Sequence, residues 1–116
     1  MALAMMVATL ASIAELTVGL MGLLGRLPRN HFAGIRTKST LASDEAWQEA
    51  HRAASAPMIF AAVAALAMGL ALLPFVVAGR VGDGLAIGVV IIQAAMLIAG
   101  AAAGVVLGQQ AARQQV

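Results

Sequence analysis

RNHFAGIRTKSTLASDEAWQEAHR, residues 29–52, is the one long stretch of this 116-residue chain that is not mostly apolar. It contains both histidines and the single tryptophan, together with three of the five acidic and four of the seven basic residues. Apolar stretches long enough to cross a membrane flank it on both sides. The fold is therefore decided here, where a polar connection separates one membrane-spanning part of the chain from the rest.

The composition is typical of an integral membrane protein. The chain is 62% hydrophobic and only 10% charged, whereas about 25% of the residues of soluble domains are charged. The net charge of +2 is explained by basic residues beside membrane spans, so we expect no nucleic-acid partner. Because the chain has no cysteine, disulfides and thiol chemistry are excluded.

Three apolar stretches, at residues 2–24, 57–78 and 85–107, are long enough to span a bilayer. The first would form a helix of roughly 34 Å at 1.5 Å per residue. A cleaved signal peptide is the alternative for it, but no basic residue precedes this stretch and it is longer than a usual signal core. We predict a single all-α membrane domain with three transmembrane helices and a polar loop at residues 25–56.

The second half of the polar loop has the pattern of a short amphipathic helix. Ser43 is a typical N-cap residue. Trp47, Ala50, His51 and Ala54 follow at helical spacing, so they share one face. We predict that this short helix lies at the membrane interface, with the tryptophan at the depth of the lipid headgroups.

Basic residues predict the orientation of the chain. In a protein with three spans, six of the seven fall on one side, and only Arg80 falls on the other. Because positively charged loops stay inside the cell, we predict a cytoplasmic loop and C-terminus and an outside N-terminus. The six residues are Arg26, Arg29, Arg36, Lys38, Arg52 and Arg113.

Two strongly polar side chains lie within the predicted spans: Glu15 near the middle of the first and Gln93 in the third. Such residues usually face the interior of a helix bundle or a water-filled cavity, and they mark a functional site by default. A hydrogen-bonded group without a further role is the alternative for Glu15. We leave both interpretations open.

Gly100, Gly104 and Gly108 form a GxxxGxxxG stripe on the third span. Small residues at this spacing let helix backbones approach closely in lipid. We favour packing within the chain, and a homo-oligomer is the alternative.

Motifs of catalysis and of cofactor binding are absent from the sequence. His31 and His51 do not have the spacing of metal ligands on one helix. Neither a nucleophile elbow nor a phosphate-binding glycine loop is present. We therefore expect neither an enzyme nor a bound metal or cofactor.

The polar segment reads N-x-F-x-G-I-R-T-x-x-T-L-x-x-x-x-x-W-x-x-x-H-R from Asn30 to Arg52. This pattern resembles the signature of the SdpI family of small bacterial membrane proteins. The family often has glycine shortly after the last arginine, whereas Ala53, Ala54 and Ser55 follow it here. The residues that the resemblance marks for a structural cap or for partner or lipid binding are Asn30, Phe32, Gly34, Arg36, Thr37, Thr40, Trp47, His51 and Arg52.

A structural cap at the membrane surface would explain the motif physically. Gly34 permits a tight turn, and Arg36 can bind a lipid phosphate or pair with Glu45 or Glu49. We favour this cap, and a direct ligand-binding role is the alternative.

The resemblance also implies a function. The family's named member resembles an immunity protein, which protects a toxin-producing bacterium from its own secreted killing peptide. We therefore expect a plasma-membrane protein that confers immunity to a membrane-active peptide toxin or acts by binding another membrane component. Its partners would be membrane lipids and a membrane protein or toxin. The alternatives are an accessory subunit of a larger membrane complex and a small proton-coupled exporter that uses Glu15.

Overall fold

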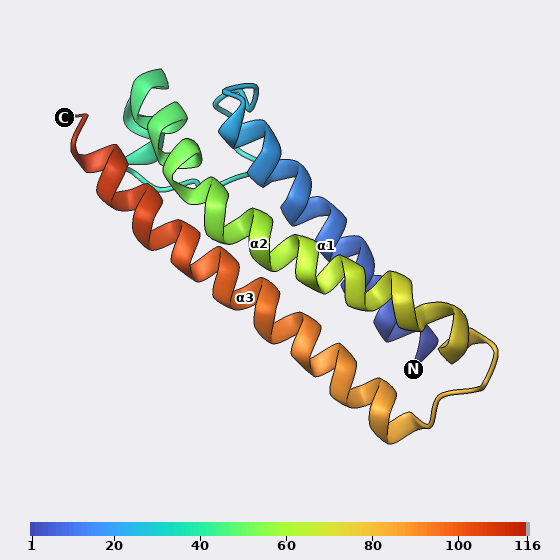
Figure 1. The fold of residues 1–116 in the computed structure, drawn as a ribbon. Helices are drawn as coiled ribbons and strands as arrows, with labels where there is room; N and C mark the ends of the chain where they lie inside the picture. Colours follow the sequence, from blue (N-terminus) through green and yellow to red (C-terminus); the bar gives the residue numbers. More distant parts are fainter. Residues whose placement is uncertain (116) are drawn as a thin grey trace.

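The computed structural model describes residues 1–115, which form a bundle of three long helices (Figure 1). These are α1 (Ala2–Leu23), α2 (Asp44–Val77) and α3 (Asp83–Arg113), and a 3-10 turn, η1 (Thr40–Ala42), lies between α1 and α2. The bundle measures 53 × 20 × 20 Å. Each helix is long and apolar enough to cross a membrane. The predicted all-α fold with three spans is thus confirmed.

The central helix of the bundle is α2, which packs against both α1 and α3, whereas α1 and α3 contact each other less. The N-terminus and the connection from α2 to α3 lie at one end of the bundle, which we call the turn end (Figure 1). The long loop between α1 and α2 and the end of α3 lie at the other, which we call the loop end (Figure 1). The side of the membrane that each end faces stays a prediction.

Glycines bring the helix backbones close together. All three glycines of the GxxxGxxxG stripe are buried on α3, and a Cβ atom at Gly100 would lie 3.0 Å from the carbonyl oxygen of Pro57 on α2. On α1, a Cβ atom at Gly22 would lie 2.8 Å from the carbonyl oxygen of His51. Such close approach is the use that membrane helices make of small residues. The stripe therefore packs within the chain, as we favoured.

The second helix differs from the prediction. The residues expected to form a separate interfacial helix are the first turns of α2, which continues through Pro57 without a break. Proline lacks an N–H, so the helix gives up one hydrogen bond at this point. The buried face nevertheless continues past it, from Ala54 to Met58 and Ala62, and packing on that face holds the two parts together. Ser43 caps the start as predicted, accepting from the N–H of Ala46 at 3.0 Å.

Left-handed glycines end the first two helices. Gly25 has φ 68° and Gly79 has φ 72°. The N–H of Arg26 donates to the carbonyl of Met21 at 2.8 Å, and an equivalent bond closes α2. This is the Schellman arrangement, which favours glycine at the left-handed position. The third helix extends beyond the predicted span of residues 85–107 at both ends.

Candidate site at the loop end

The loop between α1 and α2 folds into the bundle instead of lying over it. Ile35 is only 7% exposed and packs with Val18 of α1 and with Ala54 and Met58 of α2. It also approaches α3, where a Cβ atom at Gly108 would lie 3.0 Å from its Cδ1 atom. The loop therefore fills the space between the ends of α1 and α3 and packs against α2.

Two motif side chains satisfy the backbone of this inserted residue. The N–H of Ile35 donates to Nε2 of His51 at 2.8 Å, and its carbonyl accepts from Oγ1 of Thr40 at 2.6 Å. Both partner side chains are buried. Because an unpaired backbone group away from water is costly, these two bonds make the insertion possible. The Nδ1 atom of His51 lies 2.8 Å from the carbonyl oxygen of Trp47, so Nδ1 carries the proton and the imidazole is neutral.

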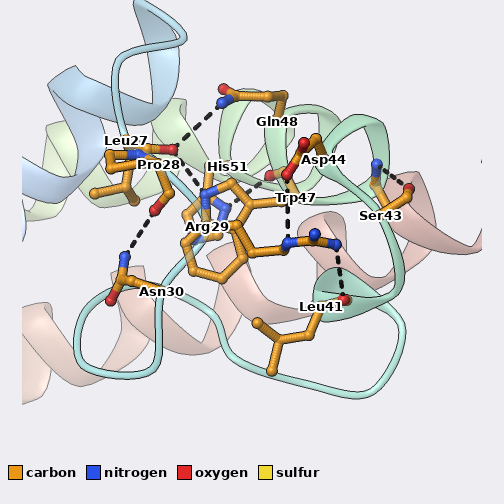
Figure 2. A network of polar contacts seen from close by, with 11 residues as sticks. Leu27, Pro28, Arg29, Asn30, Leu41, Ser43, Asp44, Trp47, Gln48 and His51 are labelled. Atoms are coloured by element: carbon orange, nitrogen blue, oxygen red, sulfur yellow. Dashed lines mark hydrogen bonds and ion pairs between the residues drawn. The ribbon is translucent and has the colours of Figure 1, made fainter.

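The inserted loop and the first turns of α2 form a cap at the loop end of the bundle, and Trp47 lies inside it. Its side chain is fully buried, and its ring centroid is 4.2 Å from that of His51. Its Nε1–H donates to the carbonyl of Leu27 at 2.8 Å, and Gln48 donates to the same oxygen at 3.3 Å (Figure 2). Trp47 is therefore buried in protein and does not face lipid headgroups, and its depth in the membrane stays a prediction. An amphipathic pattern fixes which face of a helix is apolar, but here a folded loop covers that face instead of lipid.

The first part of the loop is a turn built around Asn30. Its Oδ1 atom accepts from the N–H groups of Phe32 and Ala33 at 2.8 and 2.7 Å, and its amide donates to the carbonyl of Pro28 at 2.7 Å. Figure 2 shows this side chain folded back on the chain. The turn leaves Phe32 91% exposed. Asparagine therefore shapes the loop, while the phenylalanine of the motif is almost fully exposed.

The two motif arginines are exposed and do different things. Arg52 pairs with Glu49 at 2.8 Å on the outside of α2, and an exposed pair of this kind contributes little stability. Arg36 donates to the carbonyl of His31. It makes no ion pair with Glu45 or Glu49 within the part of the chain that the structure describes, so the pairing suggested from the sequence is wrong.

Sequence reasoning missed two further contacts of the loop. Arg29 pairs with Asp44 at 3.3 Å and so links the loop to the start of α2 (Figure 2). Thr37 donates to Oε1 of Gln109 at 2.5 Å, which links the loop to α3. The sequence carries no signal for either pair, because Gln109 lies beyond the predicted third span and no local spacing relates Arg29 to Asp44.

An open pocket of about 440 Å³ adjoins the inserted loop between α1 and α3. Residues 34–37 of the loop line one part of it, and Val18, Met58 and Val105 supply apolar surface. Glu15 lines it from α1, and its Oε2 atom is buried without a hydrogen-bond partner among residues 1–115. A Cβ atom at Gly100 would lie 3.6 Å from this oxygen. The intramembrane carboxylate and the motif loop therefore share one pocket.

Residues 26–108 match the sequence model of the SdpI/YfhL protein family. The chain belongs to this family. The matched range contains the inserted loop, all of α2 and most of α3. Neither the search of curated proteins nor that of solved structures gave a significant match.

In this member of the SdpI/YfhL family, most motif residues form the cap. Asn30, Thr40, Trp47 and His51 make hydrogen bonds that shape the loop or attach it to α2. Arg36 differs, because its exposed side chain lines the pocket. The motif therefore forms a structural cap, and one of its charged groups lines the pocket.

Gln93 lies elsewhere in the bundle, nearer the turn end. It is fully buried, and its amide donates to the carbonyl of Ala65 at 2.9 Å and to Oγ1 of Thr9 at 3.5 Å. A Cβ atom at Gly69 would overlap this hydroxyl, so the glycine makes room for the contact. Gln93 thus faces inward as predicted and links all three helices. It does not contact Glu15 through a hydrogen bond.

Replacing His51 with leucine is expected to destabilise the cap. The change leaves the N–H of Ile35 buried without an acceptor, which costs about 1–3 kcal/mol of unfolding free energy. His51→Gln keeps an acceptor of similar reach and should lose less. Thermal unfolding of the purified protein in detergent compares the two. Equal losses in both variants would contradict the assignment of the Ile35 bond as the cause.

Proposed function

We propose that the protein confers resistance to a membrane-active peptide, and that the pocket beside the loop binds this peptide. The observation that carries the proposal is the meeting of Glu15 and the family motif in a single pocket. Membership of the SdpI/YfhL family supports it, because the resemblance implies immunity to a killing peptide.

Binding rather than catalysis suits the chemistry of this pocket. It offers a carboxylate from Glu15 and a guanidinium from Arg36, set beside apolar side chains. A peptide that acts on membranes combines charged or polar groups with apolar surface. The pocket matches both parts of such a ligand. We place the loop end in the cytoplasm of a bacterial cell, as the distribution of basic residues indicates.

Survival of sensitive bacteria that express the chain tests this function. Cells are challenged with the killing peptide against which the family's named member protects. We expect the wild-type chain to protect, and we expect Arg36→Ala to reduce protection to that of cells carrying an empty vector. Arg52→Ala is the matched control, because this exposed arginine lies outside the pocket. It should protect like the wild type when both variants reach the membrane in equal amounts.

Two other outcomes would favour the alternatives. Equal protection by both arginine variants, or none by the wild type, would count against a peptide at this pocket. A stoichiometric partner recovered by gentle purification and native mass measurement would favour an accessory subunit. Proton-coupled efflux that disappears in Glu15→Gln would favour an exporter.

A further inference from the structure

The carboxylate of Glu15 lacks a counterpart inside the protein. Its Oε2 atom is buried, and no hydrogen bond reaches it from residues 1–115. The hydroxyl of Ser12, three residues earlier on α1, donates to the carbonyl of Ala8 at 2.8 Å instead. A carboxylate within a membrane helix is expensive unless it is paired. The missing partner is a hydrogen-bond donor, and a positive charge suits it best.

The surroundings of this carboxylate select an apolar body for the ligand. Val18 of α1, Met58 of α2 and Val105 of α3 line the same pocket. The volume of about 440 Å³ falls within the roughly 300–1,000 Å³ of small-molecule sites. A ligand that covers these side chains removes apolar surface from water or fills a poorly packed gap. The pocket therefore fits an amphiphile and not a bare ion.

Only two of the lining residues are charged, and they fix how an amphiphile would lie. Glu15 comes from α1, whereas Arg36 comes from the loop. The guanidinium of Arg36 repels an ammonium from the loop side of the pocket. The ammonium therefore binds beside the carboxylate of Glu15. An anionic head group is disfavoured, because the carboxylate of Glu15 repels it within the apolar part of the pocket. A cationic head at Glu15 pairs the carboxylate, and the exposed guanidinium of Arg36 stays with solvent at the loop side.

We propose that this pocket binds an amphiphilic primary amine, with its ammonium on Glu15 and its apolar body against Val18, Met58 and Val105. A primary ammonium offers N–H donors to the unpaired oxygen, which a quaternary ammonium lacks. The charge-assisted bond is stronger here than in water, because the surroundings are apolar. The inference rests on the proposed function only for the source of the amine, which would be an amino group of the toxin.

Octylamine and the methionine methyl groups of the full-length protein test the proposal. Met58 lines the pocket, whereas Met5 is fully buried on α1 near the turn end. With carbon-13 in the methionine methyl groups, NMR spectra in phosphatidylcholine nanodiscs follow both residues. We expect octylamine to shift the Met58 signal to saturation and to leave Met5 in place. Octanol and octyltrimethylammonium should give weaker, non-saturating changes.

Two variants decide whether Glu15 is the counterpart. Glu15→Gln keeps the shape and removes the charge, and it should weaken octylamine binding by at least about tenfold. Ala101 of α3 also lines the pocket. Ala101→Leu fills the pocket and leaves the carboxylate in place, so it should weaken octylamine binding too and tests the site should Glu15→Gln fail to fold. Retained affinity in Glu15→Gln, equal responses to octylamine and octanol, or equal movement of Met5 and Met58 would each overturn the proposal.

A lipid headgroup could supply the same ammonium, and the choice of lipid separates the sources. In phosphatidylethanolamine nanodiscs, lipid occupancy would displace the Met58 signal before octylamine is added. The survival assay is independent of these spectra. Octylamine binding without protection of cells would overturn the proposed function and keep the amine site. Protection that Glu15→Gln preserves, without amine binding, would overturn the amine site alone.

Discussion

Replacing Gly34 with alanine is expected to expel the loop from the bundle. The residue has φ 101°, and a Cβ atom would lie 2.5 Å from Nε2 of His51 and 3.2 Å from Cδ2 of Leu27. Backbone strain and the broken Ile35 bond together cost roughly 2–6 kcal/mol of unfolding free energy. This is a large part of the stability of a small protein.

Fluorescence of the single tryptophan measures this loss directly. Trp47 is fully buried and is held to the loop through Leu27, so the departure of the loop exposes its indole to water. We expect a red-shifted emission maximum in Gly34→Ala at temperatures where the wild type keeps its native spectrum. Helix content should change little, because the three spans satisfy their own backbones.

Two other glycines separate strain from steric overlap. Gly79 also has a positive φ, 72°, but open space surrounds it. Gly88 lies within α3 and has open space as well. Gly79→Ala therefore reports the backbone strain alone, and Gly88→Ala reports neither effect. If Gly34→Ala is no more harmful than Gly79→Ala, the contact with His51 does not hold the loop.

The three spans were predictable because lipid imposes a simple requirement. A segment within the bilayer must satisfy its own backbone and expose apolar side chains, and the sequence records both demands. Local chemistry at Ser43 also predicted a helix start, which the structure confirms at that residue. The rule that strongly polar side chains within a span face the bundle interior also placed Gln93 correctly.

Contacts between distant parts of the loop were not predictable in the same way. His51 and Ile35 are 16 positions apart, and Thr37 and Gln109 are 72 apart. No local pattern encodes such pairs. Hydropathy also ended the third span before Gln109, although a helix continues as long as packing holds it. The sequence marked Glu15 and Arg36 separately, and only the insertion of the loop shows that they line one pocket.

Replacing Gly100 with leucine is expected to force α3 away from α2 and to lower the free energy of unfolding by about 3 kcal/mol or more. A Cβ atom at this position would overlap the Cβ atom of Ala61 and lie 3.0 Å from the carbonyl oxygen of Pro57. The carbonyl belongs to a helix backbone and cannot turn aside. Denaturant unfolding of the purified protein in detergent measures the loss.

A smaller substitution identifies the contact. Gly100→Ala should cost about 1–3 kcal/mol, and Ala61→Gly in the same chain should restore part of this by removing one of the two overlapping atoms. Gly88→Ala on the same helix is the matched control, since its Cβ atom would meet no neighbour. A double variant no more stable than Gly100→Ala would mean that Ala61 is not the atom in the way.

The same experiment separates packing within the chain from a homodimer. The glycine stripe faces α2, so the loss in Gly100→Leu should not depend on protein concentration, and the native mass of the protein should stay the same. A dimer interface predicts the opposite on both counts, because association is a mass-action equilibrium and dilution would destabilise the wild type too. If unfolding of the wild type depends on protein concentration and Gly100→Leu abolishes this dependence, the stripe forms a dimer interface on the surface of the bundle and not a contact within it.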